Sequence, residues 1–586
     1  MVGARHSQTR VPGLGGEFAL TTEQTEKSVS ASCDLPEAAG VFARPLGPWP
    51  LLVIALVALV VIAPFFFRGN PSGHDFEFHL NSWMEVNQQW RAGVFYPRWA
   101  EGANYGYGEP RFIFYPPLSW LMGAGLGLVL PWKVVPGAFI WLALVFAGGS
   151  MFLLARRWLS ARDAVFAAAL YAANPYSILI VYWRSAFAEL LAAALLPLVL
   201  LLVLRLESDA PPRRRETAAA LALVVAAAWL SDAPAGVMVN YSLVLLLLAA
   251  GFAWRSWRAL AYGAFGLIAG MGLAAFYLLP AAYEQKWVDI FQAISPGVRP
   301  QDNFLFSQAP DVAHHQFNLL VSLVAAAQII VLALTVFCWR RWRRRLPTAW
   351  WLLALWGGLC VLLMLPFSGF IWNTLPKLRF MQFPWRWLVG MNVVFALLAT
   401  VSWRRWSARA VAAAVLLAAL LFAGWRVLPP WWDSAADVAE LQDNIVTGAG
   451  YEGTDEYLPK SADLDQTDHN PRHLTYAGSG NDQIHVLRWR AQKKIVLATV
   501  SAPGNLVLHL FNYPAWKVTV NGRVVAAQSR NGGGQMVIPV QAGENLVQVN
   551  FSRTWDRTAG GWVSLAALLA LGGWVAVGRR RRPEEN

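Results

Sequence analysis

Residues 72–86, SGHDFEFHLNSWMEV, follow an apolar run and hold five ionisable side chains: His74, Asp75, Glu77, His79 and Glu85. Within this stretch, Asp75 and Glu77 stand two positions apart and alternate with phenylalanines. In an extended segment both carboxylates would lie on one side of the backbone. Such a pair can hold Mg²⁺ or Mn²⁺ through its oxygens, or one member can act as general base towards a hydroxyl, assisted by His79. The alternative is a helix start, where acids complement the helix dipole.

The same loop continues with GVFYPRWAEGANYGYGEPRFIFYPPLSW, residues 93–120, in which charged groups are interleaved with aromatics, glycines and prolines. Aromatic rings alone are typical of the belt at a membrane–water interface. A belt does not require interleaved carboxylates and arginines, so the pattern favours a substrate-binding loop. The expected binding residues are His79, Arg98, Trp99, Tyr107 and Tyr115.

Two further segments place charges beside apolar runs. Arg184 and Glu189 stand at the mouth of such a run within 174–197, where a charge is costly and a functional role is the default expectation; mutual pairing is the alternative. The segment LPKLRFMQFPWRWL, residues 375–388, suits the phosphate of a lipid-linked ligand, and a solvated loop is the alternative. Its cations are Lys377, Arg379 and Arg386.

The composition of the chain indicates that these groups belong to a membrane protein. Of the 586 residues 56% are hydrophobic and 14% charged, and the mean hydropathy is +0.39. Many apolar runs approach the roughly 20 residues that span a bilayer, which predicts a polytopic α-helical membrane protein. The net charge of +13 comes with short clusters between the runs that hold, with Arg205, 21 arginines and no lysine. This pattern is typical of cytoplasmic loops and argues against a nucleic-acid partner.

The arginine clusters predict about twelve transmembrane helices, with both termini in the cytoplasm and the chemistry-bearing loops on the outer face. The expected spans are 51–67, 134–155, 163–181, 188–206, 217–231, 235–253, 259–280, 317–338, 348–368, 384–402, 408–428 and 560–578. Segment 117–132 is also apolar, but a span there would move the next arginine cluster to the outer face. It is therefore interpreted as a re-entrant or interfacial helix. The first outer loop, 68–133, is the longest within the membrane core.

Between 429 and 558 the composition changes to that of a soluble, β-rich domain. Asn521-Gly522 between two strand-like runs predicts a hairpin. We expect an extracytoplasmic antiparallel β-sandwich before the last helix. Its acidic stretch at 451–459, YEGTDEYLP, fits a carbohydrate site, a cap over a membrane cavity or an ordinary turn.

Four parts are therefore expected. They are a disordered cytoplasmic tail (1–48), a transmembrane domain (49–428), an extracytoplasmic β-rich domain (429–558) and a last transmembrane helix with a basic cytoplasmic tail (559–586). The three cysteines form no spaced pair, so neither a disulfide framework nor a zinc site is suggested.

Several motifs occur together in this chain. The first outer loop combines an acidic pair, G-x-x-x-P-R-W, a Gly/Tyr-rich stretch and F-Y-P-P-L, and later come QFPWRWL (382–388), GTDEYLP (453–459) and FNYPAWKVTVNG (511–522). From about residue 50 onward the chain resembles the bacterial 6-pyruvoyl-tetrahydropterin synthase-related and YfhO-type membrane families. These families are similar to glycosyltransferases with the GT-C membrane fold.

The resemblance implies a GT-C-like enzyme of the bacterial inner membrane. It would move a hexosyl or pentosyl group from a polyprenyl-phosphate donor to an extracytoplasmic glycan, lipid or protein acceptor. By resemblance, Asp75 is the base, Glu77 its neighbour or a metal ligand, and Glu189 the acidic position of the second outer loop. The donor phosphate would meet Arg184 or the cations of 375–388. The alternatives are a transporter or flippase of lipid-linked glycan and a non-catalytic envelope scaffold.

Overall fold

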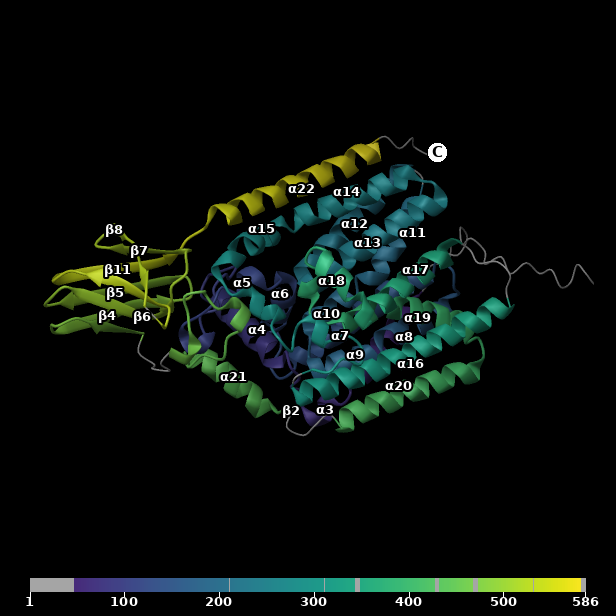
Figure 1. Ribbon diagram of the computed structural model, residues 1–586, viewed down its shortest axis with the longest axis horizontal. Coiled ribbons are helices and arrows are strands. Elements are labelled where there is room, and N and C mark those ends of the chain that lie inside the picture. Colours follow the sequence, from purple (N-terminus) through teal and green to yellow (C-terminus); the bar gives the residue numbers. More distant parts are fainter. Residues whose placement is uncertain are drawn as a thin grey trace, which may run out of the picture. The chain divides into compact units, whose positions relative to one another are not determined.

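The computed structural model describes residues 47–209, 211–309, 311–342, 348–426, 432–466, 473–530 and 532–580. The expected disordered tail at 1–48 lies outside the described residues except for its last two positions, and so do the last residues of the C-terminal basic tail. In the described part, long helices occupy one side and two β-sheets the other (Figure 1).

Long apolar helices make up most of the described chain. Nine are long and apolar enough to cross a membrane, or up to eleven if each of two bent pairs is one span. The elements within the nine are α2 (Trp49–Ile62) with α3 (Phe65–Arg68), α7 (Val135–Ala155), α8 (Ala161–Ala172) with α9 (Pro175–Leu179) and η2 (Ile180–Arg184), α10 (Phe187–Ala193) with α11 (Leu196–Ser208), α13 (Ala233–Trp254), α16 (Val312–Trp342), η8 (Pro384–Trp387) with α19 (Leu388–Ser402), α20 (Trp406–Arg426) and α22 (Trp555–Arg580). The bent pairs join α14 (Trp257–Leu273) to α15 (Ala275–Glu284) at 68° and α17 (Thr348–Leu363) to α18 (Gly369–Thr374) at 93°.

These helices coincide with eleven of the twelve expected spans. The remaining one, at 217–231, falls within α12 (Pro211–Ser231), whose first turns carry three arginines and a glutamate. The segment at 117–132 contains α6 (Pro117–Leu126). Its 10 residues rise about 15 Å, half of the hydrocarbon thickness of a bilayer, so this helix does not span.

Short polar residues start the helices that lead to the site. Asn174 precedes Pro175 and accepts a hydrogen bond from the N–H of Ser177 at 2.9 Å, which begins α9. Asp232 does the same for α13, accepting from the N–H of Ala235 at 3.0 Å.

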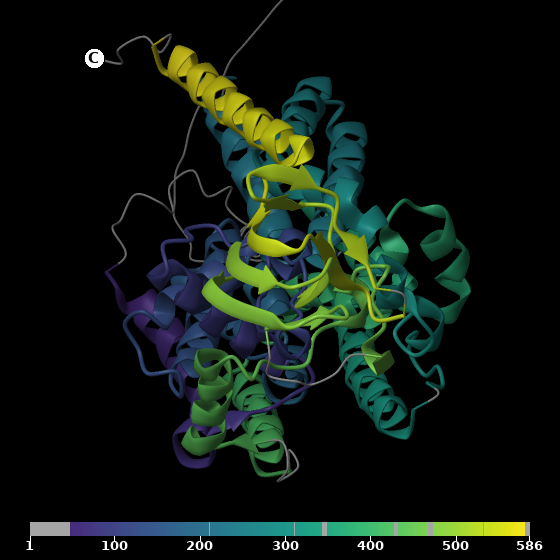
Figure 2. The same ribbon diagram turned by 90° about the vertical axis from the view of Figure 1, so that its left-hand side faces the viewer.

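Two antiparallel sheets form the domain before α22, which we call the β-domain, and Figure 2 looks onto it. The four-stranded sheet has the order β3 (Leu474–Ala477), β6 (Gly504–Phe511), β10 (Gln535–Val540), β9 (Gln528–Ser529). The five-stranded sheet has the order β4 (Asp482–Arg490), β5 (Lys493–Val500), β11 (Gly543–Phe551), β7 (Trp516–Val520), β8 (Arg523–Val525). The expected hairpin joins β7 to β8, with positive φ at Asn521 (52°) and Gly522 (78°).

The helices and the β-domain meet through the first outer loop. This loop contains α4 (Phe76–Arg91) and α5 (Arg111–Phe114), and its aromatic side chains complete the hydrophobic core of the β-domain. Asn70–Pro71 (β1) also pairs with Trp432–Asp433 (β2), just before α21 (Ala435–Thr447). We call this end of the helices the β-domain face.

Candidate active site

The site is built where one apolar helix breaks. η2 is a π-helix that ends at Ser185, whose backbone is left-handed at φ 52°. A helix end leaves carbonyl groups without partners in the helix. Here the carbonyl of Arg184 accepts a hydrogen bond from the N–H of Asp75 at 2.9 Å. The carbonyl of Trp183 accepts from the N–H of His74 at 3.3 Å. The break therefore fixes the start of α4.

Gly73 allows this close approach. A Cβ at Gly73 would lie 2.3 Å from the carbonyl oxygen of Trp183, closer than any side chain can come. The N–H of Gly73 donates to the hydroxyl of Ser185 at 3.0 Å, and that hydroxyl donates to the carbonyl of Pro71 at 2.9 Å. The resulting connection places the side chain of Asp75 opposite Arg184.

Four charged side chains converge at this point, and we call them the charge cluster: Asp75, Arg184, Glu189 and Arg386. Arg184 donates through Nη1 to Glu189, and its Nη2 lies 3.6 Å from the carboxylate of Asp75. Arg386 donates through Nε to the same oxygen of Glu189 at 3.1 Å. Three of the side chains are buried, whereas that of Asp75 is 40% exposed. Asp75 is therefore the member that a substrate can reach.

Glu189 is saturated by its partners. Its second oxygen accepts a hydrogen bond from the hydroxyl of Tyr176 at 2.5 Å. Two guanidinium groups thus share one buried carboxylate, and Asp75 offsets the remaining positive charge only from 3.6 Å. Buried Asp232 also interacts electrostatically with Arg386 and Glu189. The two guanidinium charges are therefore balanced by Glu189 and Asp75, and Asp75 is the partner held at the longer distance.

Aromatic rings enclose the guanidinium groups. The centre of the Arg184 guanidinium lies 4.9 Å from the ring centroid of Trp385, and that of Arg386 lies 4.9 Å from Phe383. The two rings stack on each other at 4.6 Å. Cation–π contacts of this kind hold an arginine in one orientation without neutralising it.

Two predicted binding residues face the charge cluster from the first outer loop. The rings of His79 and Tyr115 lie 5.8 Å apart, and both interact electrostatically with Asp75. Burial lowers the pKa of His79 to about 4, so the imidazole is neutral at pH 7. Its Nδ1 is buried and has no hydrogen-bond partner among the described residues. His79 can therefore orient a polar group, but it does not supply positive charge.

The expected carboxylate pair is corrected by the structure. HDFEFH is a helix start: Asp75 is the residue before α4, and Glu77 lies in its first turn. On a helix, residues two apart point to different sides, so the exposed Glu77 does not join Asp75. Within the described ranges, no three His, Cys, Asp or Glu side chains gather as a metal site. The helix start therefore places Asp75 and Glu77 on different sides of α4.

Two aromatic residues that were assigned to substrate binding pack elsewhere. Trp99 is fully buried against Tyr513 and Trp516 of the β-domain. Tyr107 stacks on His509, with ring centroids 3.7 Å apart. Both attach the loop to the β-domain, because large rings gain more from burial there than at the loop surface.

Two of the three cations at 375–388 also lie apart from the charge cluster. Lys377 and Arg379 are exposed. Lys377 donates to Gln285 at 3.3 Å, and the guanidinium of Arg379 lies 5.6 Å from the ring centroid of Phe291. Only Arg386 reaches Glu189, because Pro384–Trp387 turns it inward.

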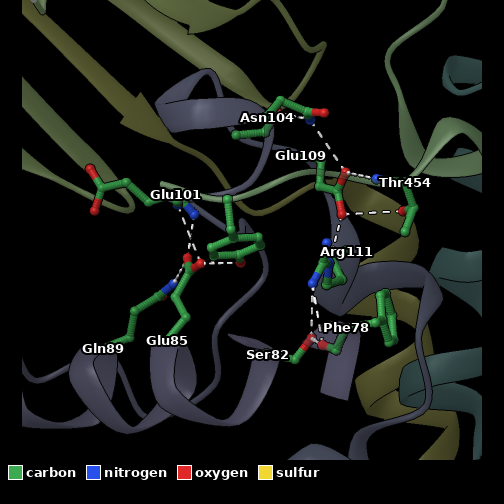
Figure 3. A network of polar contacts seen from close by, with 12 residues as sticks. Phe78, Ser82, Glu85, Gln89, Glu101, Asn104, Glu109, Arg111 and Thr454 are labelled. Carbon is green, nitrogen blue, oxygen red and sulfur yellow. Dashed lines mark hydrogen bonds and ion pairs between the residues drawn. The ribbon is translucent and has the colours of Figure 1, made fainter. Parts of the chain in front are cut away.

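A second polar network connects the loop to the start of the β-domain segment (Figure 3). Buried Glu85 of α4 accepts hydrogen bonds from the N–H groups of Glu101 and Gly102, from Gln89, and from the hydroxyl of Tyr451 at 2.5 Å. Sequence reasoning did not select Glu85. Its position within the acidic stretch at 72–86 was the feature of the sequence that could have indicated a role for it.

The same figure shows a buried ion pair beside this carboxylate. Arg111 donates to Glu109 at 2.6 Å, and Glu109 accepts from the N–H of Thr454 at 3.0 Å. The acidic stretch at 451–459 is thus held against the first outer loop, which agrees with a cap over this face.

An apolar groove of about 800 Å³ opens between helices. It is lined by α2, α6, α7, α10, α11 and α12. Leu191 and Ser231, which line it, are close in sequence to Glu189 and Asp232. The remaining lining is almost wholly aliphatic or aromatic, and it includes Leu51, Ile54, Met122, Phe146, Leu195 and Leu198.

These features define a class: a helical membrane protein with a β-domain and a buried arginine–carboxylate site on one face. A family model described as "6-pyruvoyl-tetrahydropterin synthase related domain; membrane protein" matches residues 112–428, more than half of the chain. The protein belongs to this family. No curated protein matches the sequence.

Three solved structures are among those to which this chain is similar. Arabinofuranosyltransferase AftD from Mycobacteria is 19% identical with a TM-score of 0.38, over 65% of this chain and 27% of that one. ArnT from Cupriavidus metallidurans, bound to undecaprenyl phosphate, is 16% identical with a TM-score of 0.39, over 69% and 76%. The oligosaccharyltransferase from Archaeoglobus fulgidus is 17% identical with a TM-score of 0.37, over 70% and 56%. This chain therefore spans about a quarter of the first and just over half of the last.

Proposed function

We propose that this protein is a membrane glycosyltransferase with a GT-C-like architecture. It moves a sugar from a polyprenyl-phosphate donor to a hydroxyl-bearing acceptor on the β-domain face, which is extracytoplasmic. Asp75 accepts the proton of the acceptor hydroxyl, the acceptor oxygen bonds to the anomeric carbon, and the bond from that carbon to the phosphate oxygen breaks. The polyprenyl phosphate leaves with the electron pair of that bond.

The observation that carries this proposal is the charge cluster. An accessible carboxylate lies 3.6 Å from Arg184, which with Arg386 forms a buried, aromatic-lined pair of cations. A base next to a preorganised anion site is what a transfer with a phosphate leaving group requires. The cations stabilise the charge that develops on the phosphate, and Asp75 removes the proton from the nucleophile.

The apolar groove supports a lipid-linked donor. A polyprenyl chain is a long apolar ligand, and an apolar groove of about 800 Å³ between the helices suits it. With the chain in the groove, the phosphate would lie near Arg184 and Arg386 and the sugar near Asp75. His79 and Tyr115 would contact the sugar.

Profiling of lipid-linked sugars tests this proposal. In cells without the protein, mass spectrometry should find that one polyprenyl-phosphate sugar accumulates and that its glycosylated product disappears. The wild-type gene should restore the product, whereas Asp75→Asn should not. Unchanged donor and product pools in the deletion strain would contradict the proposal.

A further inference from the structure

Arg98 lies in the first outer loop, is not part of the charge cluster, and has no anionic partner among the described residues. Among the described residues it makes no hydrogen bond and no ion pair, and its Nη1 is buried. The side chain is half-buried, with Nη1 enclosed, and even partial burial of a cation without an anionic partner is costly. An anionic ligand would supply the hydrogen-bond acceptor that Arg98 lacks within the described residues.

Tyr96 adds a second incomplete group. The guanidinium of Arg98 lies 4.3 Å from the ring centroid of Tyr96, whose hydroxyl is also buried without a partner among the described residues. The ring of Tyr96 is held by Trp120 and Phe276, with centroids at 5.3 and 6.1 Å. Two adjacent donors, both held in place by aromatic packing, thus lack an acceptor.

The charges around Arg98 leave an excess of positive charge. The groups that interact with it electrostatically are Glu284, Arg557 and Arg553. Glu284 is already engaged by two contacts of 2.7 Å from Arg557. Arg553 is exposed and donates only to the carbonyl of Arg557, at 3.5 Å. Buried Asp556 lies beside Glu284 and does not contact Arg98.

Depth in the membrane indicates the kind of ligand. Trp555 and Trp562, in the first turns of α22, are 64% and 66% exposed, as is typical of an interfacial belt. Phe276 contacts Tyr96, and the backbone N–H of Phe276 donates to the hydroxyl of Ser564 in α22 at 2.9 Å. Arg98 therefore lies near the level at which lipid phosphates meet the apolar core.

We propose that Arg98 and Tyr96 bind the phosphate group of a membrane lipid, with Arg553 at the rim of this second site. A guanidinium and a phenol together present the charge and the directional donors that a phosphate ester accepts. The ligand is either a bulk phospholipid or a polyprenyl phosphate, and the two share this chemistry. The inference does not depend on the proposed transferase activity.

Native mass spectrometry of the full-length protein can test the site. The protein is delipidated in detergent, then offered phosphatidylglycerol in one arm and undecaprenyl phosphate in the other. In at least one arm, Arg98→Gln should retain about tenfold less lipid than wild type, since a charge-assisted hydrogen bond is lost. Arg98→Lys should retain an intermediate amount. The matched control is Arg523→Gln, because Arg523 is an exposed arginine on β8.

The two arms identify the lipid. Loss confined to phosphatidylglycerol assigns a phospholipid, loss confined to undecaprenyl phosphate assigns the polyprenyl lipid, and loss in both assigns the phosphate group itself. Retention by Arg98→Gln equal to wild type in both arms overturns the proposal. Tyr96→Phe keeps the ring packing and removes only the hydroxyl. If Arg98→Gln does not fold, unchanged retention by Tyr96→Phe overturns the proposal instead.

Discussion

Glu189 is the residue on which the geometry of the charge cluster depends most. It is buried between Arg184 and Arg386, and Tyr176 completes its hydrogen bonds. Replacing it by glutamine would keep the shape and leave two buried guanidinium groups facing a neutral amide. The two arginines hold their positions only while this carboxylate is charged.

Glu189→Gln should therefore lower the free energy of unfolding by about 3–5 kcal/mol, as when one partner of a buried ion pair is removed. Thermal unfolding in detergent measures this as a lower Tm. Lys377→Gln, at an exposed lysine that contacts Gln285 at 3.3 Å and the ring of Phe380 at 4.9 Å, should change stability by less than about 0.5 kcal/mol. Equal Tm values for the two variants would contradict the role of Glu189.

The raised pKa of Glu85 predicts that the stability of the folded protein depends on pH. Burial raises its pKa from 4.5 to about 7. Between pH 4.5 and 7 the folded protein thus holds a proton that the unfolded chain has released, so this carboxyl makes stability fall as pH rises. Burial also raises the pKa of Glu456 to about 7 and of Asp433 to about 6, so wild type must be compared with a variant.

Glu85→Gln should flatten the fall of Tm between pH 4.5 and 7, because glutamine does not titrate. The measurement is a series of thermal unfolding curves for both proteins across this range. Parallel curves would show that Glu85 titrates in the folded protein as it does in the unfolded chain.

At the scale of elements, the regular parts were predictable and the breaks were not. Among the described residues, apolar runs located nine candidate spans and two bent helix pairs, and Asn521-Gly522 located the β7–β8 hairpin, because both signals are local. HDFEFH was ambiguous between an extended segment and a helix start, and tertiary hydrogen bonds to Trp183 and Arg184 decided for the helix. α21 was missed within a segment expected to be β-rich.

The candidate site shows the same limit. Asp75, Arg184, Glu189 and Arg386 could be selected because charges beside apolar runs are costly. Trp99 and Tyr107 were assigned to the substrate because a sequence does not show which rings a distant domain will bury. Lys377 and Arg379 share a segment with Arg386, yet the turn at Pro384 directs only Arg386 inward.

Gly73 provides a test of how elements position the base. In Gly73→Ala the new methyl group would collide with the carbonyl of Trp183, which belongs to the backbone and cannot turn away. The start of α4 should shift, which lowers stability by about 1–3 kcal/mol and sugar transfer by more than tenfold. Gly125→Ala in α6, where the added Cβ meets open space, is the control. Activity of Gly73→Ala equal to that of the control would contradict this contact.

At the scale of the whole molecule, the account joins three parts. The β-domain and the first outer loop share one hydrophobic core, the charge cluster lies at the start of that loop, and the apolar groove runs between the helices. A lipid-linked donor would use the last two parts at once. If the lipid chain of the donor binds in the groove, the rate of transfer should depend on the length of that chain.

Gly149 lines the groove and has open space around its Cα, so Gly149→Leu should fill part of it. Transfer from a long polyprenyl-phosphate donor should fall about tenfold, whereas transfer from a short isoprenoid analogue should change little. Gly358→Leu, on an exposed face of α17, is the matched control. An equal loss with both donors would exclude the groove as the binding site of the lipid chain.

The central claim is that Asp75 is the base of a sugar transfer. The most direct test is transfer by purified protein from the polyprenyl-phosphate sugar that accumulates in deletion cells. Asp75→Asn should lower the transfer rate by at least about 100-fold, because general-base catalysis is lost, while its Tm stays near that of wild type. Glu440→Gln, at an exposed acid on α21, should transfer at the wild-type rate. A folded Asp75→Asn protein that transfers sugar as fast as wild type would contradict the account.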